Sequence, residues 1–236
     1  MDSITIPGRY LLMGKSRSGK TTLAVELFKA CFEGKTDRII MICPSYDQDT
    51  YAPIRKHIDE QRDIFTDDDP DVIKTIVKQI ELTRKICQEK KMKIPHTLVI
   101  IDDMSGAKIS HGGRHSPFAN FTVRCNHLNT SIMFLAQQAT GVTPTFRDNL
   151  EGLICFPTLR SKDRDWLYNE YNAMMKKKSF TKLVKQAWQG VGRKDLEEWG
   201  EHFLFITFPT RKRPRYFADF THELSTTRHH LKSNRQ

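Results

Sequence analysis

Five short runs of mainly apolar residues occur along the chain, separated by longer segments of mixed polarity. The runs are residues 10–14, 38–44, 98–101, 131–136 and 152–156. They are almost continuously apolar instead of alternating with polar positions, which is typical of strands buried on both faces of a parallel sheet. We therefore predict five buried strands at these positions.

The segments between and beyond these strands show the spacing of helices. Residues 71–91 follow a proline and place Ile73, Ile76 and Ile80 on one helical face. Further helices are expected at residues 20–32, 116–128, 162–178 and 181–188, and a closing hairpin at 202–208 and 216–220. The alternation of strands and helices predicts a three-layer α/β fold with a mainly parallel central sheet and a C-terminal hairpin.

The length of 236 residues suits one domain, which we place at residues 1–222, followed by a basic and flexible tail at 223–236. No run reaches the roughly 18 apolar residues that span a membrane. The N-terminus lacks the basic start and apolar run of a secretory signal. The five cysteines are scattered and odd in number, which argues against a disulfide framework and favours a reducing compartment.

One glycine-containing motif points to nucleotide binding. Between the first predicted strand and its following helix, the chain fits the pattern G-x-x-x-x-G-K-[ST], and a strand, a loop and a helix start form the context in which this motif binds phosphates. Lys20 is expected to reach the β- and γ-phosphates of ATP, and the Thr21 hydroxyl to bind Mg²⁺. The expected nucleotide contacts are Gly14, Lys15, Ser16, Arg17, Ser18, Gly19, Lys20, Thr21 and Thr22.

Polar residues at the ends of two later strands supply the groups that hydrolysis needs. Asp102 and Asp103 follow the buried run at 98–101, and Gln137 follows the run at 131–136. Because ligands of open α/β sheets bind at the carboxyl ends of the strands, these side chains are expected beside the phosphate motif. We assign Asp102 to Mg²⁺ through its water shell, Asp103 to the attacking water, and Gln137 to the γ-phosphate or that water.

Taken in order, these motifs resemble those of the FtsK/HerA superfamily of DNA-pumping ATPases. More narrowly, the chain is similar to the poxvirus-type genome-packaging ATPases of large DNA viruses and virophages. The resemblance covers roughly residues 8–160 and includes an Arg-x-x-His run that begins at Arg124 and an Arg-x-Asn run that begins at Arg147. It implies a RecA-like (ASCE) P-loop NTPase fold. Cellular members carry Glu at the position of Asp103, which makes the assignment of that residue weaker than that of Asp102.

The resemblance also implies an assembly and a cellular setting. Such ATPases form rings of five or six subunits, in which an arginine of one subunit reaches the γ-phosphate bound to the next. Arg124 is the preferred candidate and Arg147 the second, unless Arg147 acts within its own subunit. The implied partners are double-stranded DNA and capsid or portal proteins. The implied location is the virion or the virus assembly site, in the cytoplasm or nucleus of the infected cell.

The charge distribution agrees with a polyanionic partner. The formal net charge is +10, and residues 160–194 hold ten Lys or Arg against three acids. Candidate DNA contacts are the glycine-rich loop at 105–115, the lysines at 176–178 and the basic turn at 211–215. The alternative for each is a solvated surface or a plain connection, because charge runs usually are no more than that.

Two other functions remain open at this point. A nucleoside or nucleotide kinase also uses a phosphate loop, but it needs an acceptor pocket and has no need of paired aspartates or a large positive surplus. A nucleic-acid-binding protein could use ATP only as a switch. The ATPase rate with and without duplex DNA separates these alternatives from a DNA pump.

Overall fold

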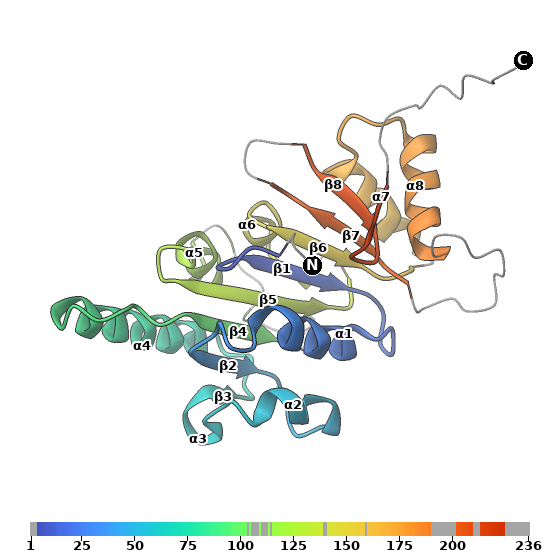
Figure 1. The fold of residues 1–236 in the computed structure, drawn as a ribbon. Coiled ribbons are helices and arrows are strands. Elements are labelled where there is room, and N and C mark those ends of the chain that lie inside the picture. Colours follow the sequence, from blue (N-terminus) through green and yellow to red (C-terminus); the bar gives the residue numbers. More distant parts are fainter. Residues whose placement is uncertain are drawn as a thin grey trace, which may run out of the picture.

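The computed structural model describes residues 4–102, 104, 109, 113, 115–138, 141–158, 160–189, 202–209 and 213–224. In this part of the chain, nine strands form one sheet in the order β3-β2-β4-β5-β1-β6-β7-β8-β9 (Figure 1). The six strands from β3 to β6 in this order are parallel to one another. Each of the last three strands pairs antiparallel with the strand before it. The predicted α/β fold with a mainly parallel sheet is confirmed.

All five predicted strands occur near their expected positions. They are β1 (Arg9–Met13), β2 (Arg38–Ile42), β4 (Thr97–Ile101), β5 (Thr130–Ala136) and β6 (Gly152–Cys155). The predicted hairpin is formed by β7 (Leu204–Thr207) and β8 (Arg215–Ala218). Two short edge strands were not predicted, namely β3 (Ile64–Phe65) and β9 (His222–Leu224).

The apolar strands are continuous because their side chains fill two separate cores. Leu11 and Met13 belong to one core, whereas Tyr10 and Leu12 belong to the other. The first core packs against α4 (Pro70–Glu89), α5 (Pro117–Arg124), α6 (Pro144–Arg147), α7 (Ser161–Tyr171) and α8 (Lys177–Gln189). The second packs against α1 (Lys20–Leu27), the π-helical turn η1 (Phe28–Phe32), η2 (Asp49–Tyr51) and α2 (Ala52–Arg55). This gives the three expected layers.

Two helix boundaries differ from the prediction. The helix expected at 162–178 ends at Tyr171, because Ala173 and Met174 adopt positive φ angles of 47° and 68° and break the helix before α8 begins at Lys177. The helix expected at 116–128 ends at Arg124, and turns lead from there to Asn129, which has a φ of 51°. The lysines at 176–178 therefore lie around the start of α8 and not at the end of α7.

The last strand that the structure describes extends past residue 222. Strand β9 pairs with β8 up to Leu224, which is buried. The predicted domain end at 222 therefore falls at the start of a strand of the sheet.

A short helix, α3 (Glu60–Asp63), precedes β3. Among the helices that the structure describes, none is both long and apolar enough to cross a membrane.

Candidate active site

The strand register brings the phosphate loop, Asp102 and Gln137 to one edge of the sheet. Met13 of β1 pairs with Ala136 of β5, and Ile101 of β4 pairs with Phe134 of β5. The residues that follow these strands therefore meet at the carboxyl edge, where the loop from β1 to α1 lies (Figure 1). Strand β5, which Gln137 follows, lies between β1 and β4.

The phosphate loop, residues 14–21, has a conformation that requires glycine at two positions. Gly19 has a φ of 87°, in the left-handed region that glycine adopts without strain. A Cβ atom on Gly14 would lie 2.6 Å from Ser18 Oγ and 2.8 Å from Phe156 Cβ, closer than side-chain atoms approach. The backbone of the loop can therefore pack closely on itself and on the end of β6.

The loop carries a buried cation and a buried hydroxyl. Lys20 is only 8% exposed, and its Nζ donates hydrogen bonds to the carbonyls of Gly14 at 2.8 Å and Lys15 at 2.9 Å. Ser18 Oγ is buried without a hydrogen-bond partner among the described residues. Buried polar groups are usually hydrogen-bonded. An ammonium group, an unsatisfied hydroxyl and a helix N-terminus at one loop therefore fit a triphosphate.

The aspartate that follows β4 lies against the first turn of α1. Thr21 Oγ1 donates a hydrogen bond of 3.0 Å to Asp102 Oδ2, although the two residues are 81 positions apart in the sequence. The hydroxyl of Tyr51 donates to the same oxygen. Asp102 is 7% exposed. A carboxylate and a hydroxyl side by side are the oxygen ligands that Mg²⁺ prefers, so these residues fit the ion directly or through its waters.

Sequence reasoning missed Tyr51. Burial raises the pKa of its phenol well above the ordinary value, and the neighbouring charge of Asp102 raises it further. The hydroxyl therefore stays protonated and acts as a donor. Tyr51 lies after β2 in a segment without helical or strand periodicity, so nothing in the sequence marks it as part of the site.

Two cavities adjoin the phosphate loop. A cavity of about 480 Å³ is lined by Ser16 to Thr22, Asp102 and Gln137, with a wall of polar residues from the segment after β2. A second cavity, of about 780 Å³, extends from Gly14 to Ser18 towards Phe156 and Arg160. Each of the nine predicted nucleotide contacts lines at least one of these cavities, and Gln137 lines both.

Arg160 is a second residue that sequence reasoning missed. Its Nη1 donates a hydrogen bond of 2.6 Å to Gln138 Oε1, and its Nε lies 3.8 Å from Asp163 Oδ2 in the first turn of α7. The side chain of Asp163 is almost fully buried and also accepts from Thr158 Oγ1 at 3.2 Å. Arg160 thus connects the end of β5, beside Gln137, to the start of α7.

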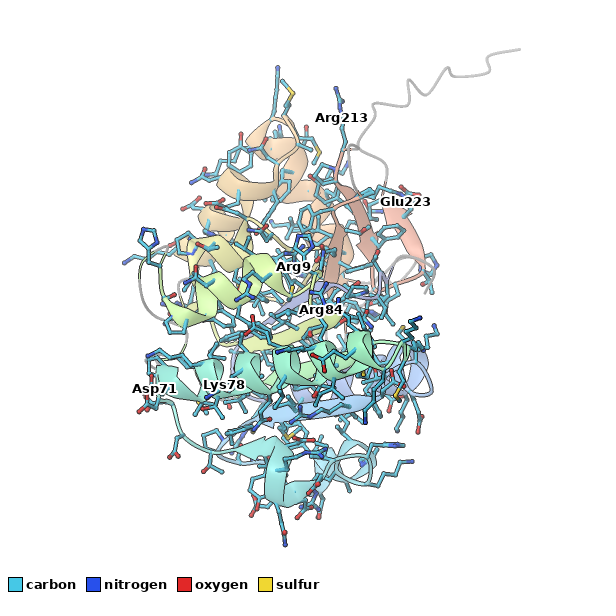
Figure 2. All side chains as sticks on the ribbon, turned by 90° about the vertical axis from the view of Figure 1, so that its left-hand side faces the viewer. Arg9, Asp71, Lys78, Arg84, Arg213 and Glu223 are labelled. Atoms are coloured by element: carbon cyan, nitrogen blue, oxygen red, sulfur yellow. The ribbon has the colours of Figure 1, made fainter. Side chains whose placement is uncertain are left out.

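The two candidate finger arginines lie away from the site of their own chain. Arg124 is exposed at the end of α5, at the amino end of the sheet, and forms an ion pair with Glu81 of α4. The guanidinium carbon of Arg147 lies 5.6 Å from the centre of the Trp166 ring. Neither arginine is among the described residues that line the two cavities. Figure 2 shows the molecule from the side on which the strands of the parallel sheet begin, with α4 running across the view from Asp71 past Lys78.

Several predicted residues lie outside the part that the structure describes. Asp103 is one of them, so its predicted role stays a prediction. In the loop 105–115, only residues 109, 113 and 115 are described, and Ile109 is buried in the core. In the turn 211–215, Arg213 is described and exposed, and Arg215 pairs with Glu223 at 2.6 Å (Figure 2).

The fold resembles solved ATPase structures. The genome packaging NTPase B204 from Sulfolobus turreted icosahedral virus 2, in complex with AMP, gives a TM-score of 0.60 with 14% identity, covering 90% of this chain and 98% of that chain. Its complex with AMPPCP gives 0.58 with 15% identity and the same coverage. EssC from Geobacillus thermodenitrificans gives 0.52 with 16% identity, over 84% of this chain and 37% of that chain. The chain therefore has a RecA-like P-loop ATPase fold.

Sequence comparison gives a narrower result. A family model described as Poxvirus A32 protein matches residues 4–192 of the chain. The matched part includes the phosphate loop, Asp102, Gln137 and both candidate arginines. No curated protein matches the chain significantly.

Proposed function

Since the chain belongs to the poxvirus A32 protein family of genome-packaging ATPases, we propose that it hydrolyses ATP to drive double-stranded DNA into a preformed viral capsid. The B204 neighbour is described as a genome packaging NTPase and was solved with AMPPCP and with ATP-gammaS. The same edge of the sheet in this chain offers two cavities at the phosphate loop. The large positive charge of +10 supports a polyanionic partner.

One contact carries the proposal. The 3.0 Å hydrogen bond between Thr21 and Asp102 joins the phosphate loop to the acidic end of β4. A triphosphate held by the loop would therefore have the carboxylate of Asp102 beside it, and this carboxylate and the Thr21 hydroxyl would be available to hold a metal ion. Binding alone needs the loop, but hydrolysis also needs the acidic strand end, so this contact favours an ATPase over a simple phosphate-binding protein.

Each residue at the carboxyl edge of the sheet has a separate role in the proposed hydrolysis. Lys20 would bind the β- and γ-phosphates, and Thr21 and Asp102 would hold Mg²⁺. When bound, Mg²⁺ neutralises negative charge on the phosphates. Asp103 accepts a proton from the attacking water or orients it. Gln137, whose amide can both donate and accept, orients that water or the γ-phosphate.

A further positive charge at the γ-phosphate comes from an arginine of a neighbouring subunit, in a ring of five or six copies. Such an arginine neutralises the charge that develops on the transferred phosphoryl group. Arg124 lies at the amino end of the sheet, the opposite end from its own phosphate loop, so it can serve only a neighbour's site. Arg147 is packed over Trp166 and is the second candidate.

DNA contacts are proposed for the basic surfaces of the C-terminal part. The lysines at 176–178 and Arg213 are exposed. Contacts of this kind bind the phosphate backbone without sequence preference and weaken with salt. The loop at 105–115 follows the acidic strand end directly and is a further candidate. Capsid or portal proteins complete the proposed set of partners, at the site of virus assembly in the infected cell.

The ATPase rate with and without linear duplex DNA tests this function. A packaging ATPase is expected to release phosphate faster with duplex, and the stimulation should fall as salt rises. Transfer of phosphate to a nucleoside would instead indicate a kinase. Nucleotide binding without turnover, with or without duplex, would indicate a switch. A rate that duplex leaves unchanged contradicts the proposed coupling.

Mixed assemblies test the role of the arginines. Lys20→Ala removes nucleotide use but keeps the arginine, whereas Arg124→Ala keeps the nucleotide site. If Arg124 acts on a neighbour, each variant alone is inactive and a mixture regains part of the activity. Arg147→Ala is the matched comparison. A mixture with Arg124→Ala that stays inactive, beside one with Arg147→Ala that recovers, would reassign the finger to Arg147.

A further inference from the structure

A tyrosine from the segment after β2 reaches the carboxylate that the proposed function assigns to Mg²⁺. Tyr51 is the last residue of η2, is 1% exposed and belongs to the core on the α1 side of the sheet. Its hydroxyl donates to Asp102 Oδ2, the oxygen that also accepts from Thr21. The thiol of Cys43 lies 3.9 Å from this hydroxyl.

One oxygen of the carboxylate accepts both hydrogen bonds. Donors from α1 and from η2 converge on Asp102 Oδ2, and α1 and η2 are in direct contact with each other. Two donors on one oxygen fix the rotation of the carboxyl group. A carboxylate that is held in this way presents its other face in one orientation, which lowers the cost of ordering it when a metal ion arrives.

Building on the proposed function, we propose that Tyr51 is a positioning residue that orients Asp102 for Mg²⁺. Partners of this kind hold metal-binding carboxylates from behind and take no part in the reaction themselves. The tyrosine ring fills the core beside α1, so the packing of Tyr51 and the donor function of its hydroxyl can be separated. The substitution Tyr51→Phe removes the hydroxyl and keeps the ring.

The test measures nucleotide binding in two metal conditions. The fluorescent nucleotide mant-ADP is titrated into the full-length protein in EDTA, and the complex is then titrated with Mg²⁺. Tyr51→Phe should bind mant-ADP in EDTA as wild type does, because the hydroxyl faces Asp102. It should need roughly 10- to 100-fold more Mg²⁺ for half of the metal-dependent gain in binding, as for other residues that support a metal ligand.

Tyr10→Phe is the matched control. Tyr10 is equally buried at 1%, lies on the same side of the sheet and uses its hydroxyl on the backbone of Thr5 at 2.6 and 2.7 Å. Loss of this hydroxyl should change the thermal stability without changing the Mg²⁺ requirement. In an Asp102→Asn background, Tyr51→Phe should have almost no further effect on the Mg²⁺ requirement, because the two residues act as a unit.

Several outcomes would overturn the inference. An unchanged Mg²⁺ requirement in folded Tyr51→Phe would do so, as would an equal loss of affinity with and without Mg²⁺. If Tyr51→Phe does not fold, 4-aminophenylalanine at position 51 keeps the ring and a donor, and must then keep the wild-type Mg²⁺ requirement. A wild-type protein that fails to bind mant-ADP would refute the proposed nucleotide site instead, so the two failures are distinguishable.

Discussion

Replacement of Gly14 by alanine tests the shape of the phosphate loop. The added Cβ would lie 2.6 Å from Ser18 Oγ and 2.8 Å from Phe156 Cβ. The hydroxyl of Ser18 can rotate away, but the Cβ of Phe156 is fixed to the backbone at the end of β6. The loop backbone must therefore move by several tenths of an ångström.

The size of the effect follows from this overlap. Overpacking at a close-packed position costs about 1–3 kcal/mol. The free loop can relax away from β6, whereas a loop wrapped around a phosphate cannot. The cost should therefore fall mainly on the bound state, and it corresponds to a roughly 5- to 150-fold higher Kd for ATP. Thermal unfolding should change little.

Gly152→Ala provides the matched control for this prediction. Its Cβ would lie 2.9 Å from two ring atoms of Tyr10 and 3.0 Å from Phe205, inside the sheet and away from the phosphate loop. This variant should lose about 1–3 kcal/mol of stability and keep its ATP affinity. Equilibrium binding of ATPγS and chemical denaturation measure both quantities. The proposed phosphate loop is wrong if Gly14→Ala binds ATPγS as tightly as wild type does. It is also wrong if Gly152→Ala loses as much affinity for ATPγS as Gly14→Ala does.

Three further predictions concern single side chains. Lys20→Ala should abolish binding of ATPγS in a calorimetric titration, because it removes the buried ammonium from the loop; measurable binding near the wild-type Kd would contradict this. Asp103→Asn should bind ATP normally and release no phosphate in a coupled assay, and unchanged turnover would remove Asp103 from the mechanism. Burial alone would raise the pKa of Asp63, but hydrogen bonds from Arg62 and Arg38 outweigh it and lower that pKa. The folded pKa thus lies below the unfolded value of about 3.9, so this carboxylate stabilises the protein above that pH and the contribution is lost as pH falls through the folded pKa. Denaturation curves should show Asp63→Asn to be about 3 kcal/mol less stable at pH 7, with the gap closing below about pH 4; a gap independent of pH would refute the ion pair.

Much of the fold could be predicted because local signals and the global fold agree. The continuous apolar runs are strands that feed two cores, and the glycine motif lies at the end of the first of them. The order of the motifs predicts the contact between Thr21 and Asp102. Thr21 lies at the start of the helix after β1, and Asp102 directly follows β4, another strand of the parallel part of the sheet. Parallel pairing then brings them together without further information.

The parts that were missed depend on contacts between distant segments or on unusual backbone conformations. Tyr51 reaches Asp102 only because η2 packs on α1 after β2, and no periodicity marks that segment. The break before α8 rests on left-handed Ala173 and Met174, which are residue types that rarely adopt positive φ. Strand β3 has two residues, too few for a pattern.

In the proposed function, ATP hydrolysis at the phosphate loop moves the protein along duplex DNA. Displacement of a labelled triplex-forming strand from linear duplex tests this most directly. We expect the wild-type protein to release the third strand with ATP and Mg²⁺, and we expect no release with AMPPCP or with the Lys20→Ala variant. ATP hydrolysis that proceeds on the same DNA without any release of the third strand would contradict the claim.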